Sequence, residues 1–104
     1  MLYIINCWEK PGMAETVAAI RETHQHYLHE TGKNLVLAGG MLTEDGKGRL
    51  GSVYLLNMPS RKAVEDWLAS EPFNKAGIFQ SATLEKMRKG HWHPENAPKS
   101  ADGE

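Results

Sequence analysis

Two neighbouring segments carry apolar side chains on both sides of a predicted strand, and this pattern constrains the fold most. Residues 34–42 and 49–58 are predicted to form a strand pair, because the Asp-Gly and second glycine between them favour a hairpin. In the first strand, Leu35, Leu37 and Met41 are expected on one side and Val36, Ala38 and Leu42 on the other. Such strands need cover on both faces of their sheet.

The first third of the chain predicts one strand and one long helix. Residues 2–8 are rich in aromatic and β-branched side chains, and Lys10-Pro11-Gly12 ends them with a turn. Residues 12–31 then follow a helical apolar pattern, and Gly32 supplies the expected stop.

A second helix and a last strand complete the pattern. Ser60 is the expected N-cap of this helix, whose end falls near Glu71 because Pro72 disfavours a helical conformation in the residue before it. Residues 73–77 are expected to form a short turn or a single helical turn, and residues 78–88 the last strand, although residues 82–87 would also suit a helix.

The resulting order, β-α-β-β-α-β, predicts an α+β fold of the ferredoxin-like, split βαβ type. Both helices would lie on one face of a four-stranded antiparallel sheet. Because two helices cover only one face, the apolar opposite face needs a partner, and a second copy of the chain is the simplest one. We therefore expect a homodimer that forms through the sheet face.

Length and charge limit the remaining possibilities. The 104 residues suffice for one domain, expected over residues 1–90, with residues 91–104 as a mobile tail. A formal net charge of -1 gives no reason to expect a nucleic-acid or membrane partner. The first residues lack a charged segment and a long apolar run, so the expected location is the cytoplasm.

No metal centre is expected. Cys7 is the only cysteine and lies within a predicted strand, where it should be a small buried apolar residue. His24 and His26 lie about 200° apart around a helix, so the helix histidines do not converge on one ion. His91 and His93 flank Trp92 and are expected at the surface.

His24 is the most informative side chain. It falls on the same helical stripe as Met13, Val17, Ile20 and Tyr27, where an apolar residue is expected. An imidazole has an unperturbed pKa of about 6.5, so such a position suits acid, base or hydrogen-bonding roles near neutral pH.

Glu71 is the candidate partner of His24. It lies four positions after Trp67, on the stripe of the second helix, and both residues fall near the ends of helices that cover the same sheet face. Two interpretations stay open from spacing alone. The pair meets and forms a site, or His24 is a satisfied core histidine and Glu71 turns towards solvent.

The chain resembles the YCII-related (YciI-like) family of the dimeric α+β barrel superfamily. The resemblance rests on Arg21-x-x-His24 in the first helix and on Glu71-Pro72-Phe73-x-x-Ala76-Gly77, supported by Leu37-Ala38-Gly39-Gly40 and Gly51-Ser52. It implies a dimeric α+β barrel with an active site at His24 and Glu71. Two departures stand out, because the family usually has aspartate at position 71 and more often proline at position 40.

The resemblance implies a small-molecule enzyme. The expected chemistry is that of a general acid/base lyase or isomerase, dehydrochlorinase-like, which needs no metal or organic cofactor. The candidate substrate-binding residues are Arg21, Tyr27, Gly39, Gly40, Ser52 and Phe73. Two alternatives are a non-catalytic dimeric module that binds a small ligand or serves as an accessory subunit, and a cofactor-free monooxygenase.

Overall fold

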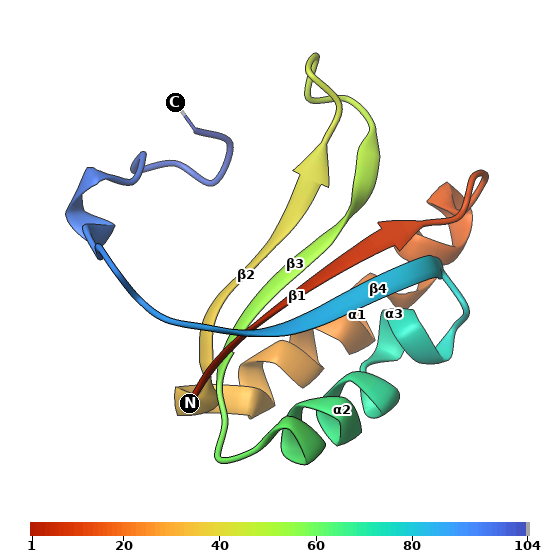
Figure 1. The fold of residues 1–104 in the computed structure, drawn as a ribbon. Helices are drawn as coiled ribbons and strands as arrows, with labels where there is room; N and C mark the ends of the chain where they lie inside the picture. Colours follow the sequence, from red (N-terminus) through yellow and green to blue (C-terminus); the bar gives the residue numbers. More distant parts are fainter. Residues whose placement is uncertain (104) are drawn as a thin grey trace.

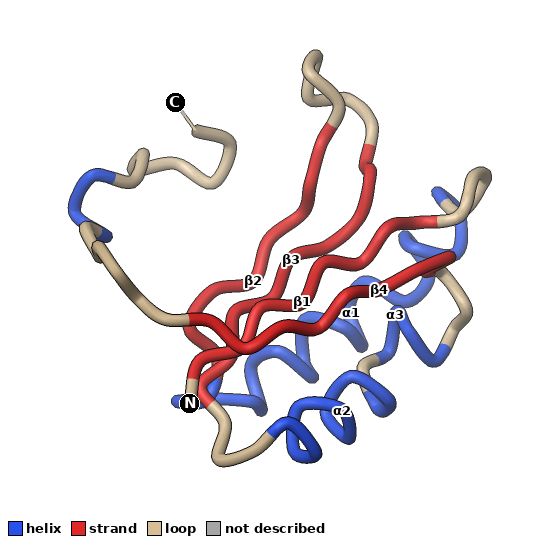
Figure 2. Tube along the Cα trace, in the orientation of Figure 1, coloured by secondary structure: helices blue, strands red, loops and turns tan. Residues whose placement is uncertain are grey.

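Four antiparallel strands form one sheet, and the three α-helices lie on one face of it (Figures 1 and 2). The computed structural model describes residues 1–103. The elements follow in the order β1 (Leu2–Glu9), α1 (Ala14–Thr31), η1 (Gly32–Asn34), β2 (Leu35–Leu42), β3 (Arg49–Asn57), α2 (Arg61–Ser70), α3 (Pro72–Lys75), β4 (Phe79–Met87) and η2 (Pro94–Asn96). The sheet order β2-β3-β1-β4 confirms the predicted ferredoxin-like α+β fold.

The core lies between the sheet and the helices. Alternate side chains of β1 and β3 point into it, and each is at most 3% exposed. These residues are Tyr3, Ile5 and Cys7 on β1 and Ser52, Tyr54 and Leu56 on β3. The register pairs Ile5 with Tyr54 and Cys7 with Ser52, so two polar side chains enter an otherwise apolar layer.

The ends of the helices follow local sequence signals. Gly32 has a positive φ of 59° after α1, a conformation that glycine adopts without steric cost. The Ser60 side chain accepts a hydrogen bond from the Ala63 backbone N at 3.1 Å, as expected of an N-cap. Helix α1 begins at Ala14, two residues after the predicted start at Gly12, because Gly12 still belongs to the turn. Met13 precedes the helix and provides no side-chain cap.

One prediction about the sheet is wrong in detail. Strict alternation predicts Leu35 and Leu37 on the same side of β2, but they lie on opposite sides. Leu35 pairs with Leu56, which faces the helices, and Leu37 pairs with Leu55, which faces away. A bulge at Val36 adds one residue to this strand and shifts the alternation.

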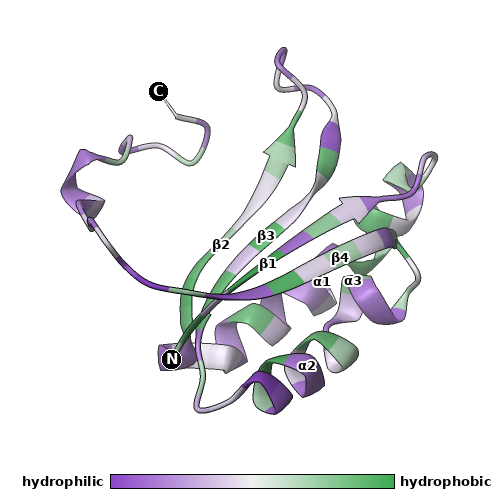
Figure 3. Ribbon diagram, viewed as in Figure 1, coloured by the Kyte–Doolittle hydropathy of each residue, from purple (hydrophilic) through white to green (hydrophobic). Residues whose placement is uncertain are grey.

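Apolar residues occur along the strands of the sheet (Figure 3), and several on the face away from the helices are exposed. Leu37 is 56% exposed, Trp8 42% and Val36 40%. Part of this surface lies near the segment after β4, since Trp92 and Lys89 line a hollow together with Leu2 and Val36. The chain then extends away from the sheet through η2 (Figure 1).

Among residues 1–103, no helix is both long enough and apolar enough to cross a bilayer. The predicted tail of residues 91–104 ends at Glu104, which lies outside the described residues, and its mobility stays a prediction.

Candidate active site

His24 and Glu71 meet beneath the sheet. Helix α1 turns His24 inward, about two helical turns beyond Val17, and leaves it 6% exposed. His24 Nδ1 lies 2.5 Å from Glu71 Oε1, and the Glu71 side chain is fully buried. A buried carboxylate needs such partners, because its removal from water is costly.

The position of Glu71 depends on the break between two helices. Its backbone is extended, with φ -67° and ψ 127°, as favoured before Pro72. Its side chain caps α3, since Oε2 accepts a hydrogen bond from the Asn74 backbone N at 3.0 Å. Asn74 Nδ2 in turn donates to the Leu68 carbonyl at 2.9 Å. Both carboxylate oxygens are therefore occupied, and the acid is fixed in place.

This geometry orients the imidazole. Because a carboxylate oxygen accepts hydrogen bonds, we assign the hydrogen between the two side chains to His24 Nδ1. In the neutral form of this tautomer, Nε2 carries the lone pair. Phe73 stacks on the His24 ring, with centroids 3.8 Å apart and an interplanar angle of 6°, and restricts its rotation.

A small cavity of about 130 Å³ opens at His24. Its volume is slightly below the roughly 150 Å³ of an enclosed cavity that binds benzene, so it has room for a small molecule only. It lies among α1, β2, β3 and α3. Its lining consists of Arg21, His24, Gln25, Leu28, Ala38, Gly39, Gly40, Arg49, Ser52, Tyr54 and Phe73.

Arg49 brings a permanent positive charge to the cavity. Its Nε donates to Glu9 Oε2 at 2.8 Å, and its Nη2 donates to Ser52 Oγ at 3.0 Å. The guanidinium also lies 5.6 Å from the centre of the Phe73 ring. A Cβ at Gly40 would lie 2.8 Å from Nη1, so the glycine leaves the space that the guanidinium occupies.

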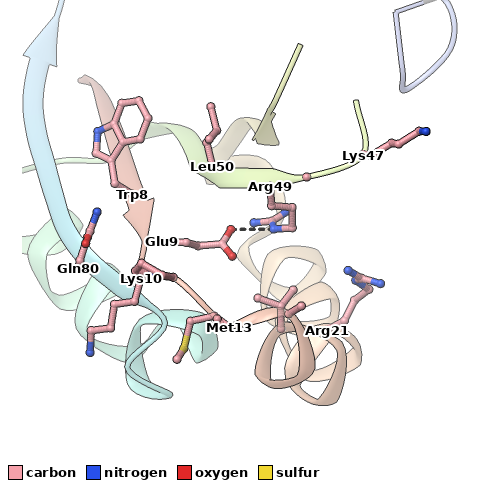
Figure 4. A pocket seen from close by; sticks show the side chains of 14 residues that line it. Trp8, Glu9, Lys10, Met13, Arg21, Lys47, Arg49, Leu50 and Gln80 are labelled. Atoms are coloured by element: carbon pink, nitrogen blue, oxygen red, sulfur yellow. Dashed lines mark hydrogen bonds and ion pairs between the residues drawn. The ribbon is translucent and has the colours of Figure 1, made fainter. Parts of the chain in front are cut away.

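A larger cavity of about 540 Å³ adjoins the first (Figure 4). Arg21 and Arg49 line both spaces, and Figure 4 shows Arg49 bonded to Glu9 at its wall. Its lining does not include His24 or Glu71. The His24–Glu71 pair therefore belongs to the smaller cavity.

Tyr54 is among the residues that line the smaller cavity, and its hydroxyl is buried. Burial, followed by the charge of Glu71, raises the pKa of Tyr54, whereas nearby Ser52 and Arg49 oppose the rise. Despite the proximity of Ser52, Tyr54 Oη makes no hydrogen bond of acceptable geometry within the described part of the chain. The hydroxyl therefore stays protonated and able to donate.

The structure brings together most of the residues singled out from sequence. Arg21, Gly39, Gly40, Ser52 and Phe73 line the cavity with His24, and Glu71 lies directly behind the imidazole. Their functional roles stay predictions.

Tyr27 is placed elsewhere. Its hydroxyl donates to the Trp67 carbonyl at 2.7 Å, and its ring packs against the Trp67 ring, with centroids 5.3 Å apart. It joins the two helices and does not line the cavity. Its position one helical turn from His24 brings it to the same face of α1 but not to the same opening.

Arg49 and Tyr54 were not singled out as site residues from the sequence. A signal was present for Tyr54, because it lies two positions after Ser52 and so shares its side of β3. Arg49 carried no such signal, since its contact with the cavity depends on Glu9 from a neighbouring strand.

Other reactive groups lie outside the site. Burial, and then the charge of Glu71, raises the pKa of Cys7 to about 12, so its thiol is a poor nucleophile. His26 lies 3.9 Å from Glu30 on the exposed side of α1. Within residues 1–103, no three His, Cys, Asp or Glu side chains are grouped closely enough to hold a metal ion.

The fold and the cavity together define a class of protein. The fold is the ferredoxin-like α+β arrangement of the proteins known as dimeric α+β barrels, here with a buried His-carboxylate pair at a small cavity. The YCII-related domain matches residues 1–88, and the chain belongs to that family.

Curated relatives agree with this assignment. Protein YciI from Escherichia coli O6:H1 is 27% identical over 97 residues, which cover 86% of this chain and 98% of the relative. An uncharacterized protein from Haemophilus influenzae is 26% identical over 96 residues, with the same coverage.

Two solved structures extend the comparison. One is the 5-chloro-2-hydroxyhydroquinone dehydrochlorinase TftG from Burkholderia phenoliruptrix AC1100, in complex with 2,5-dihydroxybenzoquinone. It matches with a TM-score of 0.80 and 26% identity, over 86% of this chain and 96% of that chain. An antibiotic biosynthesis monooxygenase matches with a TM-score of 0.52 and 18% identity, over 85% of this chain and 97% of that chain, and shows the shared fold alone.

Proposed function

We propose that this protein is a small-molecule enzyme, a general acid/base lyase or isomerase of the dehydrochlorinase kind. The observation that carries the proposal is the 2.5 Å contact between His24 Nδ1 and Glu71 Oε1 at the wall of a cavity of about 130 Å³. Proton abstraction from carbon requires a base that is held in position and shielded from bulk water. A buried carboxylate would hold the base here.

The proposed reaction begins at His24 Nε2. The imidazole takes a proton from a C–H bond of the bound ring, and Glu71 stabilises the imidazolium that forms. In an elimination from the diketo tautomer of a chlorinated hydroxyhydroquinone, the electron pair of the sp3 C–H bond next to the chlorine-bearing carbon forms a C=C bond, while the carbon-chlorine bond breaks and chloride leaves with its electron pair. In an isomerisation, the same proton returns to another carbon.

Support for the elimination comes from the likeness to TftG, whose name states that reaction class. The guanidinium of Arg49 offers the departing anion a positive charge at the same cavity. Arg21 lies at the opening shared with the larger cavity, on the route that an anion would follow to solvent.

We also propose that two copies associate through the open sheet face. The support is the exposed apolar surface that includes Trp8, Val36 and Leu37, which two copies would cover for one another. Location in the cytoplasm stays a prediction from the sequence.

The proposal is tested by anaerobic chloride release from 5-chloro-2-hydroxyhydroquinone. We expect His24→Ala and Glu71→Gln each to lower kcat by about 10²–10⁴-fold, because one lacks the base and the other misorients it. The amide introduced by Glu71→Gln keeps an acceptor oxygen for the Asn74 N–H, so this variant should stay folded by circular dichroism. Glu71→Asp is the matched control, expected to stay within about tenfold of the parent.

Two results would contradict the proposal. Chloride release that survives His24→Ala would remove its base. Oxygen consumption in the presence of substrate, with no chloride released under anaerobic conditions, would favour the monooxygenase chemistry instead.

A further inference from the structure

Arg49 has one nitrogen without a hydrogen-bond partner, and this nitrogen lies at the smaller cavity. Its Nε donates to Glu9, and its Nη2 donates to Ser52 Oγ and to a backbone carbonyl. Nη1 donates to no acceptor among residues 1–103, and it is not one of the fully buried polar atoms. It faces Gly40, since a Cβ there would lie 2.8 Å from it. The two N–H groups of Nη1 are therefore within reach of a ligand in the cavity.

The guanidinium of Arg49 is held in place by its neighbours. Glu9, whose side chain is 8% exposed, accepts from Nε at 2.8 Å. On another side, the guanidinium lies 5.6 Å from the centre of the Phe73 ring, which stacks on His24. A group that is already fixed loses little conformational entropy when it binds a ligand. Nη1 is thus a preorganised cationic donor in the same cavity as the imidazole.

Arg21 brings a second guanidinium to the boundary between the two cavities. It lines both spaces, as Arg49 does, and Figure 4 shows the two side chains entering from α1 and β3. Arg21 is exposed and forms no ion pair within residues 1–103, so it is free to turn towards a ligand. Lys10 and Lys47 also line the larger cavity, but Figure 4 shows them extending away from Arg49.

The charges at this boundary favour a singly charged anion. Glu9 is the only acidic residue in either lining, and it is already paired with Arg49. Glu71 lines neither cavity and is bonded to His24. The charge of Arg21 is then unbalanced, which suits a monoanion better than a phosphate dianion. Guanidinium groups bind carboxylates well, because paired N–H donors match the two oxygens.

We infer that Arg49 Nη1 and Arg21 bind the carboxylate of a small organic acid, whose uncharged part occupies the smaller cavity beside His24. This names the substrate class of the proposed enzyme, and it rests on the proposed function only for the step that follows binding. A carboxylate held at one end positions the rest of a small acid at the base, which lowers the entropic cost of proton transfer.

The probe is crotonate, a small planar monoanion, and calorimetric titration compares it with crotonamide, which has the same shape and no charge. The buffer contains no chloride, because chloride would compete for the same guanidinium. We expect the parent protein to bind crotonate at least about tenfold more tightly than crotonamide. Methyl phosphate is the phosphate-bearing probe and should bind no more tightly than crotonate.

Two variants remove the proposed contacts. Arg49→Lys keeps a cation for Glu9 but lacks Nη1, and we expect the Kd of crotonate to rise about 10- to 100-fold, the usual effect of losing a hydrogen bond between charged groups. Arg21→Gln should raise it less, about threefold to tenfold, because water and salt screen an exposed charge. For crotonamide, both variants should change the Kd by less than about threefold, because the amide carries no charge.

Arg61→Gln is the matched control. It removes the same charge from α2, where Arg61 is 55% exposed, lies 3.8 Å from Glu65 and lines neither cavity. Crotonate affinity should stay within about twofold, which separates a local contact from the net charge of the protein. Circular dichroism checks the fold of each variant, and the exposed position of Arg21 keeps the test decisive if Arg49→Lys does not fold.

Four outcomes decide the inference. Equal affinity of the parent for crotonate and crotonamide, or no binding of crotonate, would overturn it. Tighter binding of methyl phosphate than of crotonate would overturn the assignment to carboxylates. Chloride release from 5-chloro-2-hydroxyhydroquinone by a parent that does not bind crotonate would overturn the inference and leave the proposed function standing. Crotonate binding that depends on Arg49 and Arg21, in a protein that releases no chloride, would support the inference while the proposed catalytic function fails.

Discussion

The two faces of the sheet differ in how far their apolar side chains are buried. On the covered face, Ile5, Cys7 and Leu56 are fully buried by helices of the same chain. On the open face, Leu37 and Trp8 remain 56% and 42% exposed. Helices of the same chain cover the apolar side chains of one face, whereas the apolar surface of the open face is not covered by this chain.

The difference extends to polar groups. The covered face holds the buried Glu71 carboxylate, which is stable there because His24 and Asn74 occupy its oxygens. The open face holds no comparable pair among the residues the structure describes. A site for chemistry needs shielding and fixed partners, and only the covered face offers both within one chain.

The largest expected effect concerns the open face. Leu37→Asp places a charge where two copies would meet, so we expect it to convert a dimer into a monomer of 11.6 kDa. Light scattering coupled to size exclusion measures this change. Thr23→Asp, on the exposed side of α1, is the control and should leave the mass unchanged. A parent protein that is monomeric at micromolar concentration would contradict the dimer.

Gly39 and Gly40 are adjacent in β2, so side chains added at the two positions would point to opposite faces of the sheet. A Cβ at Gly40 would meet Arg49 Nη1 at 2.8 Å, whereas one at Gly39 would meet nothing within 4 Å in its own chain. We expect Gly40→Ala to displace the guanidinium and weaken binding of 2,5-dihydroxybenzoquinone by about threefold to tenfold, roughly the worth of one weakened charged contact. The fold should persist, because the Arg49 side chain can move.

Gly39→Ala is the matched control for that measurement. Its side chain would point to the open face, opposite Val53, and ligand affinity should stay within about twofold. Equal losses of affinity in the two variants would show that the strand itself, not the contact with Arg49, controls the cavity.

The smallest effect is a pH dependence of stability on the covered face. The pKa of Cys7 is raised from 9.0 to about 12 by burial and then by Glu71, so the folded chain keeps the thiol protonated while the unfolded chain ionises it. Stability is therefore complete below pH 9 and decreases between pH 9 and 12. At pH 10 the loss should be about 1.4 kcal/mol.

Urea titrations at pH 8 and pH 10 measure this loss. Cys7→Ala serves as the control, because it lacks the ionising group, and its free energy of unfolding should fall less over the same interval. Parallel pH dependences in the two proteins would remove Cys7 as the cause.

Local sequence signals sufficed for most of the fold. The apolar periods placed each strand and helix, and Gly32 and Ser60 ended or began helices through backbone freedom and a capping bond. The bulge at Val36 escaped this reasoning, because an extra residue in a strand becomes visible only when the partner strand sets the register.

The sequence predicted the candidate site about as completely as it predicted the fold. The stripe of α1 singled out His24, and the stripe of the second helix singled out Glu71, although Glu71 lies beyond the end of α2 and caps α3. Tyr27 shared the helical period of His24 but contacts Trp67, which lies in another helix. Periodicity predicts on which side of a helix or strand a residue lies, but not which residue of another element it contacts.

By itself, the sequence determined the order of strands and helices, the apolar faces and the presence of an imidazole and a carboxylate where apolar residues were expected. These features depend on residues within a few positions of one another. Only the tertiary structure decided that His24 Nδ1 meets Glu71 Oε1, that Arg49 fills the space left by Gly40, and that Tyr54 Oη is unpaired. Such contacts join residues distant in sequence, and packing of the whole sheet and its helices sets their geometry.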